Sequence, residues 1–372
     1  MIDMINKVKH GKFHSFRIFT KKVEEILILQ LNYHGKLMDI DSIRNNILGI
    51  RVIQKSDGLI VKSNSGNLYS PKLRITDSEI EEVISYIQQL KDVTERNGIK
   101  FLYCVAPAKD VYVEAPRNII NHGKIIHEKF LLALKSSQIP TLNFEKVIND
   151  NNISKDNDIF YSTDHHWRAY IGFLACSAIC EELSLLYGFS YNKEYTNLDN
   201  YNITHYPHLF LGSYGRKTGP YFSWHGADDF ELIIPKFETS LIEEKPIKNH
   251  IREGKFEDTV LYLSHMKKNY YHDNPYNTYG GGDDRFQLVR NNINPNGEKI
   301  LLVRDSFANV VTPFLSLQVK ELHICDMRDF GNYTEKKINL ESYMKEIQPD
   351  YVIVLYNSIF SKKNSKGKYD FF

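Results

Sequence analysis

Hydrophobic and polar positions in this chain follow two periods, one typical of helices and one of buried strands. Between positions 80 and 93, apolar residues recur at intervals of three and four: Ile80, Val83, Ile84, Ile87, Leu90 and Val93. This spacing predicts an amphipathic helix. Thr76 and Glu79 have the spacing of a capping box at its start, and Asn97-Gly98 supplies a stop signal. The apolar run 99–107 that follows is typical of a strand buried on both faces.

The same signals continue on either side of this pair of elements. Residues 127–138 predict a helix, and 141–144 predict a short strand. Residues 167–187 predict a second long helix with its apolar stripe beginning at Trp167, and Gly188 is placed to end it as the C′ residue. Residues 56–70 predict a hairpin around a Ser-Asn-Ser-Gly turn.

The C-terminal part of the chain alternates regularly between the two periods. Strands are predicted at 299–305, 319–327 and 350–357, and helices at 306–317 and 340–347. A βαβαβ series of this kind favours a parallel, doubly wound α/β sheet.

Residues from about 191 to 295 lack this regularity. They are rich in Tyr, Asn, Gly and Pro, with short strand-like pieces, and predict an irregular β-containing insertion. We therefore divide the chain into an N-terminal segment with a hairpin (1–75), the first part of an α/β domain (76–190), the insertion (191–295) and the second part of the domain (296–372).

Composition narrows the class of protein. The 372 residues have 42% hydrophobic and 25% charged residues, as in a globular protein, and a net charge of +1 gives no case for nucleic acid. Apolar stretches such as 23–31 are shorter than the roughly 20 residues that cross a bilayer, and the N-terminus lacks a signal-peptide pattern. The sequence as given therefore predicts a soluble, cytoplasmic chain. The four cysteines lack zinc-pair spacing and favour buried thiols.

Ser306 is the first candidate for chemistry. It follows an apolar strand and begins a predicted helix, so it lies at the carboxyl edge of the sheet, where open α/β folds bind ligands. A serine at such a turn exposes its hydroxyl, and the free amides of the helix start can hold an oxyanion. The alternative interpretation is that Asp-Ser here is an ordinary N-cap.

A base and an orienting acid are available in Asp164 and His166. Residues i and i+2 do not face each other on a helix, so the pair can cooperate only in a turn before the helix that follows. The alternative is that Asp164 caps the helix while both His165 and His166 are solvated. A metal site fits less well, because no shared helical face joins the histidines, although His205 and His208 could add ligands.

Two basic positions could bind an anionic donor or acceptor. Lys109 follows a predicted strand and so lies at the same sheet edge as Ser306, whereas Arg216 lies in the insertion. The alternative for both is a solvated surface side chain. No glycine-rich phosphate loop, dinucleotide fingerprint or sign of a redox cofactor is present.

Two motifs in the sequence resemble those of a known family. "TDHHW" at 163–167, followed by "RDSFAN" at 304–309 and "PFL" at 313–315, resembles the DHHW protein family. That family is similar in turn to the SGNH-like alginate O-acetyltransferases AlgX and AlgJ. Weaker likenesses are "DGLIVK" at 57–62, "FLGSYGRKTG" at 210–219 and "YNTYGGGDD" at 276–284. The resemblance implies a permuted SGNH-hydrolase-like fold, and it implies a location at the cell surface.

Carried over by position, the resemblance implies a role for each residue of the two motifs. Asp164 is the orienting acid, His166 the base and Ser306 the nucleophile, and Trp167, next to the base, is a candidate for binding substrate. Gly281, Gly282 and Asn357 are the candidates for completing an oxyanion hole with the Ser306 amide.

The function expected from residues and resemblance together is a carbohydrate O-acetyltransferase with a serine acyl-enzyme. Its acceptor is a cell-surface polysaccharide or related glycan. No cofactor is expected to stay bound, since the acetyl group would come from acetyl-CoA or from a membrane-bound partner. An esterase using the same triad and a glycan-binding module with a decayed site are the alternatives left open.

Overall fold

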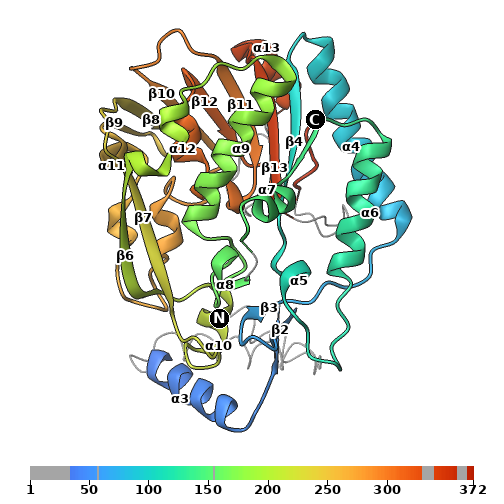
Figure 1. Cartoon of the computed structure of the whole chain (residues 1–372), viewed down its shortest axis with the longest axis vertical. Helices are drawn as coiled ribbons and strands as arrows, with labels where there is room; N and C mark the ends of the chain where they lie inside the picture. Colours follow the sequence, from blue (N-terminus) through green and yellow to red (C-terminus); the bar gives the residue numbers. More distant parts are fainter. Residues whose placement is uncertain (1–33, 57, 154–155, 329–338, 358–366) are drawn as a thin grey trace, which may run out of the picture.

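A computed structural model describes residues 34–56, 58–153, 156–328, 339–357 and 367–372. Its centre is an eight-stranded mixed sheet with strand order β5-β4-β13-β11-β12-β10-β8-β9 (Figure 1). The first five strands in this order are parallel: β5 (Thr141–Asn143), β4 (Lys100–Ala106), β13 (Tyr351–Asn357), β11 (Lys299–Arg304) and β12 (Glu321–Cys325). The α/β class is confirmed.

Helices cover both faces of the sheet, as the buried strands predicted. Along β4, Phe101 and Tyr103 face one hydrophobic cluster, while Leu102 and Cys104 face the other. The first face packs against α4 (Asp77–Arg96), α6 (Gly123–Ser136) and α13 (Leu340–Ile347). The second packs against α7 (Phe144–Asp150), α9 (Ala169–Tyr187) and α12 (Thr312–Ser316). Successive strand residues point to opposite faces, so a strand covered on both sides is apolar throughout.

Local signals placed several helix ends correctly. The capping box of α4 is present, because Thr76 Oγ1 accepts from the Glu79 amide at 3.3 Å and Glu79 Oε2 accepts from the Thr76 amide at 2.8 Å. Asn97 caps the C-terminus of α4 and Gly188 caps that of α9, and the φ of 73° at Gly188 is the left-handed conformation that glycine tolerates. Helix α13 has the predicted bounds.

The segment 191–295 contributes strands to the central sheet as well as a ribbon of its own. It forms a separate two-stranded ribbon of β6 (Tyr201–Phe210) and β7 (Asp228–Pro235), but three further strands extend the sheet: β8 (Leu241–Lys245), β9 (His250–Gly254) and β10 (Phe286–Asn291). Strand β10 pairs antiparallel with β12, which would otherwise be an edge of the parallel sheet. The sheet is therefore mixed: the strands predicted to be parallel are parallel, and the strands of this segment are added to them by antiparallel pairing. The domain boundaries stay predictions.

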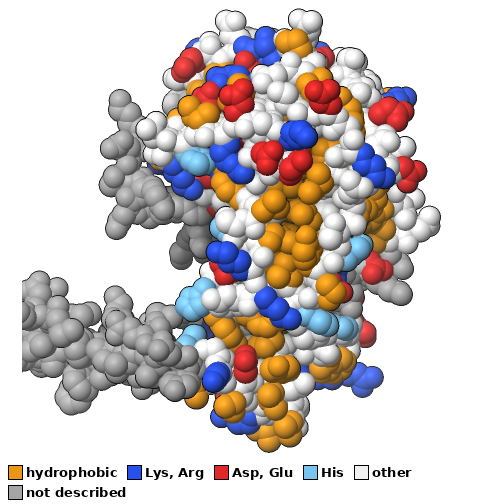
Figure 2. Space-filling model, turned by 90° about the vertical axis from the view of Figure 1, so that its left-hand side faces the viewer, with side chains coloured by type: hydrophobic (Ala, Val, Ile, Leu, Met, Phe, Trp, Pro, Cys, Tyr) orange, Lys and Arg blue, Asp and Glu red, His pale blue; other side chains and the backbone are white. Residues whose placement is uncertain are grey.

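Short elements connect these strands. The helix α11 (Phe256–Thr259) lies against β8 and β9. The 3-10 helices of this segment are η1 (Lys193–Thr196), η2 (Leu198–Asn200), η3 (Pro246–Lys248), η4 (Leu263–His265) and η5 (Pro275–Thr278). Figure 2 views the side formed by β6 to β9 and shows a central group of hydrophobic side chains among charged ones. Ile203 of β6 and Ile251 of β9 are among the exposed apolar residues of these strands.

The N-terminal part of the described chain lies at the end of the sheet to which the parallel strands point (Figure 1). It comprises α3 (His34–Ile47), β1 (Val52–Lys55), β2 (Gly58–Lys62) and β3 (Leu68–Tyr69). The predicted hairpin is confirmed, since β2 and β3 pair antiparallel across the Ser-Asn-Ser-Gly turn. Residues 1–33, including the apolar stretch 23–31, fall outside the described residues.

One helix corrects the expectation that nothing resembles a membrane span. Within the described ranges, α9 is long and apolar enough to cross a membrane by length and composition. Its buried residues, among them Ile171, Phe173 and Ile179, belong to the main hydrophobic cluster of the sheet. The apolar character of α9 is therefore explained by its place in the core.

Candidate active site

Ser306 lies at the turn between β11 and the short helices that follow it. It is the first residue of the 3-10 helix η6 (Ser306–Val310), and α12 follows after Val311. A single helix was expected here. Pro313 in the first turn of α12 has no amide hydrogen and cannot continue an earlier helix, which accounts for the break.

The turn itself is closed by the N-cap residue Asp305. Its Oδ1 accepts from the Phe307 amide at 3.0 Å, and its carbonyl accepts from the Ala308 amide at 3.1 Å. The Ser306 N–H has no acceptor among the described residues. This amide is therefore free to bind a developing oxyanion.

Asp164 and His166 occupy a buried loop between α8 (Asp156–Ile159) and α9. An isolated bridge between Phe160 and Trp167 closes the loop, so the pair lies before the helix, as the chemistry requires. His166 Nδ1 is 2.5 Å from Asp164 Oδ1, and His166 Nε2 is 2.8 Å from Ser306 Oγ. The three side chains thus form one hydrogen-bonded chain across 140 positions of sequence.

Further hydrogen bonds fix the Asp164 carboxylate. Oδ1 also accepts from the His166 amide at 2.9 Å, and Oδ2 accepts from the amide of Ser213, the first residue of α10 (Ser213–Thr218). Burial opposes the charged form, but the attraction of His166 and His165 and the Ser213 amide outweigh it and hold the pKa of Asp164 well below its usual range. Asp164 is therefore a carboxylate that orients His166.

Aromatic rings enclose the His166 imidazole. Tyr276 stacks on it with ring centroids 4.1 Å apart, and His165 lies 3.8 Å away on a tilted plane. His165 Nδ1 is also 3.0 Å from Ser213 Oγ. Rings on neighbouring planes leave the imidazole little freedom to rotate away from Ser306.

Trp167 holds the serine turn through a hydrogen bond to its backbone. Its indole N–H donates to the Phe307 carbonyl at 2.8 Å, and its side chain has no exposed surface. The ring also meets Phe144 edge to face. The expectation that Trp167 contacts substrate is wrong, because a fully buried ring cannot reach one.

The two basic residues singled out from the sequence lie in different surroundings. Lys109, the first residue of α5 (Lys109–Tyr112), is buried, and its ammonium donates to three backbone carbonyls of the loop that carries Asp164. With all three hydrogens engaged, it is not available to bind an anion. Arg216 lies on α10 and donates to the Asp273 carbonyl at 3.5 Å. Its role in binding stays a prediction.

The glycine-rich turn is tied to the strand that carries the nucleophile. Gly281 and Gly282 have φ values of 75° and 91°, which favour glycine. Arg304, at the end of β11, donates to the Gly282 carbonyl at 3.1 Å and to Asp283 Oδ1 at 3.0 Å. Asn309 of η6 donates to the same Asp283 oxygen at 3.1 Å. The turn therefore adjoins η6, and an oxyanion role for its glycines stays a prediction.

Asn357 adjoins the serine turn from the neighbouring strand. Its amide donates to Asp305 Oδ2 at 2.9 Å, and Lys368 pairs with the same oxygen at 2.6 Å. The backbone N–H of Asn357 is thus engaged in holding the turn, and a role for its side chain in the oxyanion hole also stays a prediction.

One group of side chains is close enough together to hold a metal ion. The ligand atoms of Asp164, His165 and His166 lie within 4.8 Å of one another. Hydrogen bonds already engage these groups, however. Asp164 binds the His166 ring and the Ser213 amide, His165 meets the Ser213 hydroxyl, and His166 meets Ser306. A metal would have to displace these partners, so the geometry fits a hydrogen-bonded Asp–His–Ser arrangement better than a metal site.

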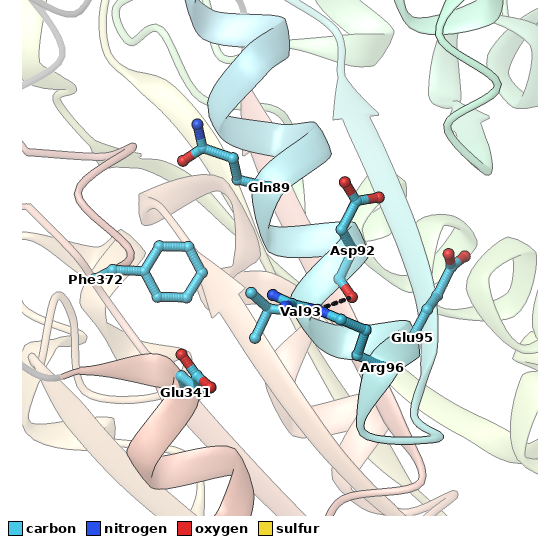
Figure 3. A pocket seen from close by; sticks show the side chains of 7 residues that line it. All are labelled: Gln89, Asp92, Val93, Glu95, Arg96, Glu341 and Phe372. Carbon is cyan, nitrogen blue, oxygen red and sulfur yellow. Dashed lines mark hydrogen bonds between the residues drawn. The ribbon is translucent and has the colours of Figure 1, made fainter.

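A pocket lies on the other face of the sheet (Figure 3). It is lined by Gln89, Asp92, Val93, Glu95, Arg96, Glu341 and Phe372. These residues come from α4, α13 and the C-terminus, whereas His166, η6 and α9 belong to the opposite face. The pocket is therefore separate from the candidate site.

Sequence reasoning missed Ser213, Asp228, Tyr276 and Asp283, which surround the triad. The "FLGSYGRKTG" likeness pointed to the turn that holds Ser213. The "YNTYGGGDD" likeness likewise begins at Tyr276 and contains Asp283, although it did not indicate that Tyr276 stacks on His166. For Asp228 no local signal exists, because it accepts from the Ser162 amide across 66 positions of sequence.

Comparison with known proteins confirms the resemblance. A family model described as DHHW protein matches residues 43–325. A search of curated proteins finds no match to this chain. Among solved structures, Bacillus cereus PatB1 is 19% identical, with 84% of this chain and 99% of that chain covered and a TM-score of 0.67. A DHHW family protein from Eubacterium siraeum is 17% identical, covering 86% and 96%, with a TM-score of 0.60.

The O-acetyltransferase domain of Pseudomonas putida AlgJ also matches, at 12% identity over 80% of this chain and 90% of that domain, with a TM-score of 0.47. At these identities the likenesses establish a shared fold with PatB1 and the Eubacterium protein, and no more. The family match includes both the Asp164–Trp167 loop and Ser306, and it spans most of the sequence. The chain therefore belongs to the DHHW protein family.

Proposed function

We propose that this protein is a carbohydrate O-acetyltransferase in which Ser306, His166 and Asp164 form the catalytic triad. The observation that carries the proposal is the continuous hydrogen-bonded chain from Asp164 through both ring nitrogens of His166 to the Ser306 hydroxyl. Nucleophile, base and orienting acid are each within reach of the next, which is the arrangement serine acyl transfer requires.

In the first half of the reaction, His166 Nε2 takes the Ser306 proton as Oγ attacks the acetyl carbonyl. The tetrahedral oxyanion is held by the Ser306 amide, and Asp164 stabilises the imidazolium through Nδ1. Collapse breaks the bond to the donor's leaving group, which takes the proton from His166. The acetyl ester on Ser306 results.

In the second half, a sugar hydroxyl gives its proton to His166 and attacks the acetyl ester. Collapse of the second tetrahedral intermediate releases the O-acetylated sugar and returns the proton to Ser306. The donor is a co-substrate, acetyl-CoA or an acetyl group delivered by a membrane-bound partner, and the acceptor is a glycan. Transfer to sugar is proposed over hydrolysis because the motifs resemble those of alginate O-acetyltransferases.

The test is intact-protein mass after brief incubation with an aryl acetate, followed by addition of an oligosaccharide. Wild type is expected to gain an acetyl group that Ser306→Ala and His166→Ala do not gain. Ser316→Ala is a matched control, since Ser316 is buried on α12 and donates to the Pro313 carbonyl. Labelling of Ser306→Ala would exclude this nucleophile. Free acetate as sole product would indicate an esterase.

A further inference from the structure

The loop that carries Asp164 is irregular and buried, so its backbone polar groups need partners other than a helix or sheet. Tyr161, Ser162, Thr163 and Asp164 are all at most 3% exposed. Burying an unpaired carbonyl or amide costs on the order of 1–3 kcal/mol each. The groups that satisfy this loop therefore determine where Asp164 and His166 lie.

Lys109 satisfies the carbonyls. Its ammonium donates to the carbonyl oxygens of Tyr161 at 2.6 Å, Ser162 at 2.9 Å and Asp164 at 2.8 Å. An ammonium has three hydrogens, so all are used. Lys109 is 3% exposed, and it comes from the segment after β4, more than 50 positions away from the loop.

Asp228, at the start of β7, satisfies the amides of the same loop. Its Oδ1 accepts from the Ser162 amide at 2.5 Å, and its Oδ2 accepts from the Thr163 amide at 2.9 Å and the Thr163 hydroxyl at 2.5 Å. Asp228 is 4% exposed. The loop is thus held between a buried cation on its carbonyls and a buried anion on its amides.

We propose that Lys109 and Asp228 are a positioning pair, which fixes the loop so that His166 meets Ser306. The inference rests on the proposed function, because it concerns the same triad. Ser162 and Thr163, whose amides bind Asp228, immediately precede Asp164. Lys109 also donates to the carbonyl of Asp164 itself. Displacement of a catalytic group by about 1 Å can lower the rate about 10²-fold.

The charges around Lys109 are complementary to its ammonium. Asp228 from β7, Asp164 from the loop and Asp156 from α8 favour the protonated form, whereas Arg168 at the start of α9 opposes it. Burial lowers the pKa of Lys109 to about 8. A neutral amine has two hydrogens for three carbonyls, so deprotonation would release one of them.

The test combines a structural signal with kinetics in Lys109→Met and Asp228→Asn. The proton between His166 Nδ1 and Asp164 is expected to give a low-field NMR signal that is absent from His166→Ala. Both variants are expected to shift or lose this signal and to lower kcat for acylation about 10- to 100-fold with KM unchanged. Lys62→Met is the matched control, because Lys62 is also buried but donates to Asn46.

Thermal melting by circular dichroism establishes that each variant is folded. If Lys109→Met does not fold, Asp228→Asn decides alone, because it keeps the side-chain volume. Wild-type signal and kcat in a folded variant with a lowered Tm would overturn the proposal and leave a purely structural pair. No acylation by wild type, together with a signal that still shifts in the variants, would refute the proposed function and not the positioning role.

Discussion

Trp167→Phe tests how much the serine turn depends on the support beneath it. The substitution removes the indole N–H that donates to the Phe307 carbonyl at 2.8 Å. Loss of one buried hydrogen bond costs about 0.5–1.5 kcal/mol. The smaller ring also leaves a cavity beside Phe144, which raises the expected loss in the free energy of unfolding to about 2–4 kcal/mol.

The chain offers a matched control, because it has two tryptophans and the other is on the surface. Trp224 is 51% exposed, so Trp224→Phe is expected to change the free energy of unfolding by about 0.5 kcal/mol or less. Urea unfolding followed by circular dichroism suits both variants, since it does not depend on tryptophan fluorescence.

The rate of acylation is a second quantity to measure in the same two variants. Phe307 directly follows Ser306, so loss of the hydrogen bond from the Trp167 indole to the Phe307 carbonyl is expected to lower the rate of acylation by an aryl acetate as well. If Trp167→Phe is as stable as Trp224→Phe and acylates at the wild-type rate, the indole bond supports neither the fold nor the turn, and the reasoning is refuted.

Three further predictions follow from other contacts. Gly212→Ala places a Cβ 2.2 Å from Asp164 Cβ, so it should lower the rate of acylation at least about 10-fold. In the control Gly98→Ala the new Cβ meets nothing within 4 Å, so this variant should lose only about 1 kcal/mol of stability. Equal rates of acylation in the two variants would contradict this prediction. Burial opposes the charge of Asp283, but Arg304 and Arg328 outweigh it and lower its pKa, so it stabilises the fold above the unfolded pKa of about 4 and this contribution is lost as pH falls. The difference in unfolding free energy between wild type and Asp283→Asn should therefore shrink from pH 5 to pH 2, and a constant difference would exclude the mechanism. All four cysteines are buried and free, and burial raises the pKa of Cys104, Cys180 and Cys325, so N-ethylmaleimide should label the protein in urea and leave the native protein unlabelled.

The elements that sequence analysis placed well depend on neighbours in sequence. The Thr76–Glu79 box involves residues three apart, and a helix such as α13 is specified by its own apolar spacing. The Asp164–His166 turn was inferred for a similar reason, since residues two apart cannot meet on a helix. These constraints are local, and the structure agrees with them.

The parts that could not be predicted depend on distant partners. Nothing in the segment around Lys109 indicates that its ammonium will meet carbonyls more than 50 positions away, so the sequence predicts either an anion-binding or a solvated side chain, and the structure shows neither. Likewise, nothing near residue 286 indicates that β10 will pair with β12. Trp167 was placed correctly in sequence but given the wrong contact, because burial of a single ring depends on the whole core.

The position of β13 in the sheet has a consequence for how the protein is made. This strand lies between β4 and β11, and its first residue Tyr351 pairs with Lys100 of β4, 251 positions earlier in the sequence. During synthesis β4 can pair with β5 soon after both have emerged, but its other edge stays unpaired until β13 has left the ribosome. Strands that pair over such distances fold slowly and expose apolar edges meanwhile. Nascent chains of this protein should depend on chaperones, and products interrupted before residue 351 should neither complete the sheet nor acquire a working triad.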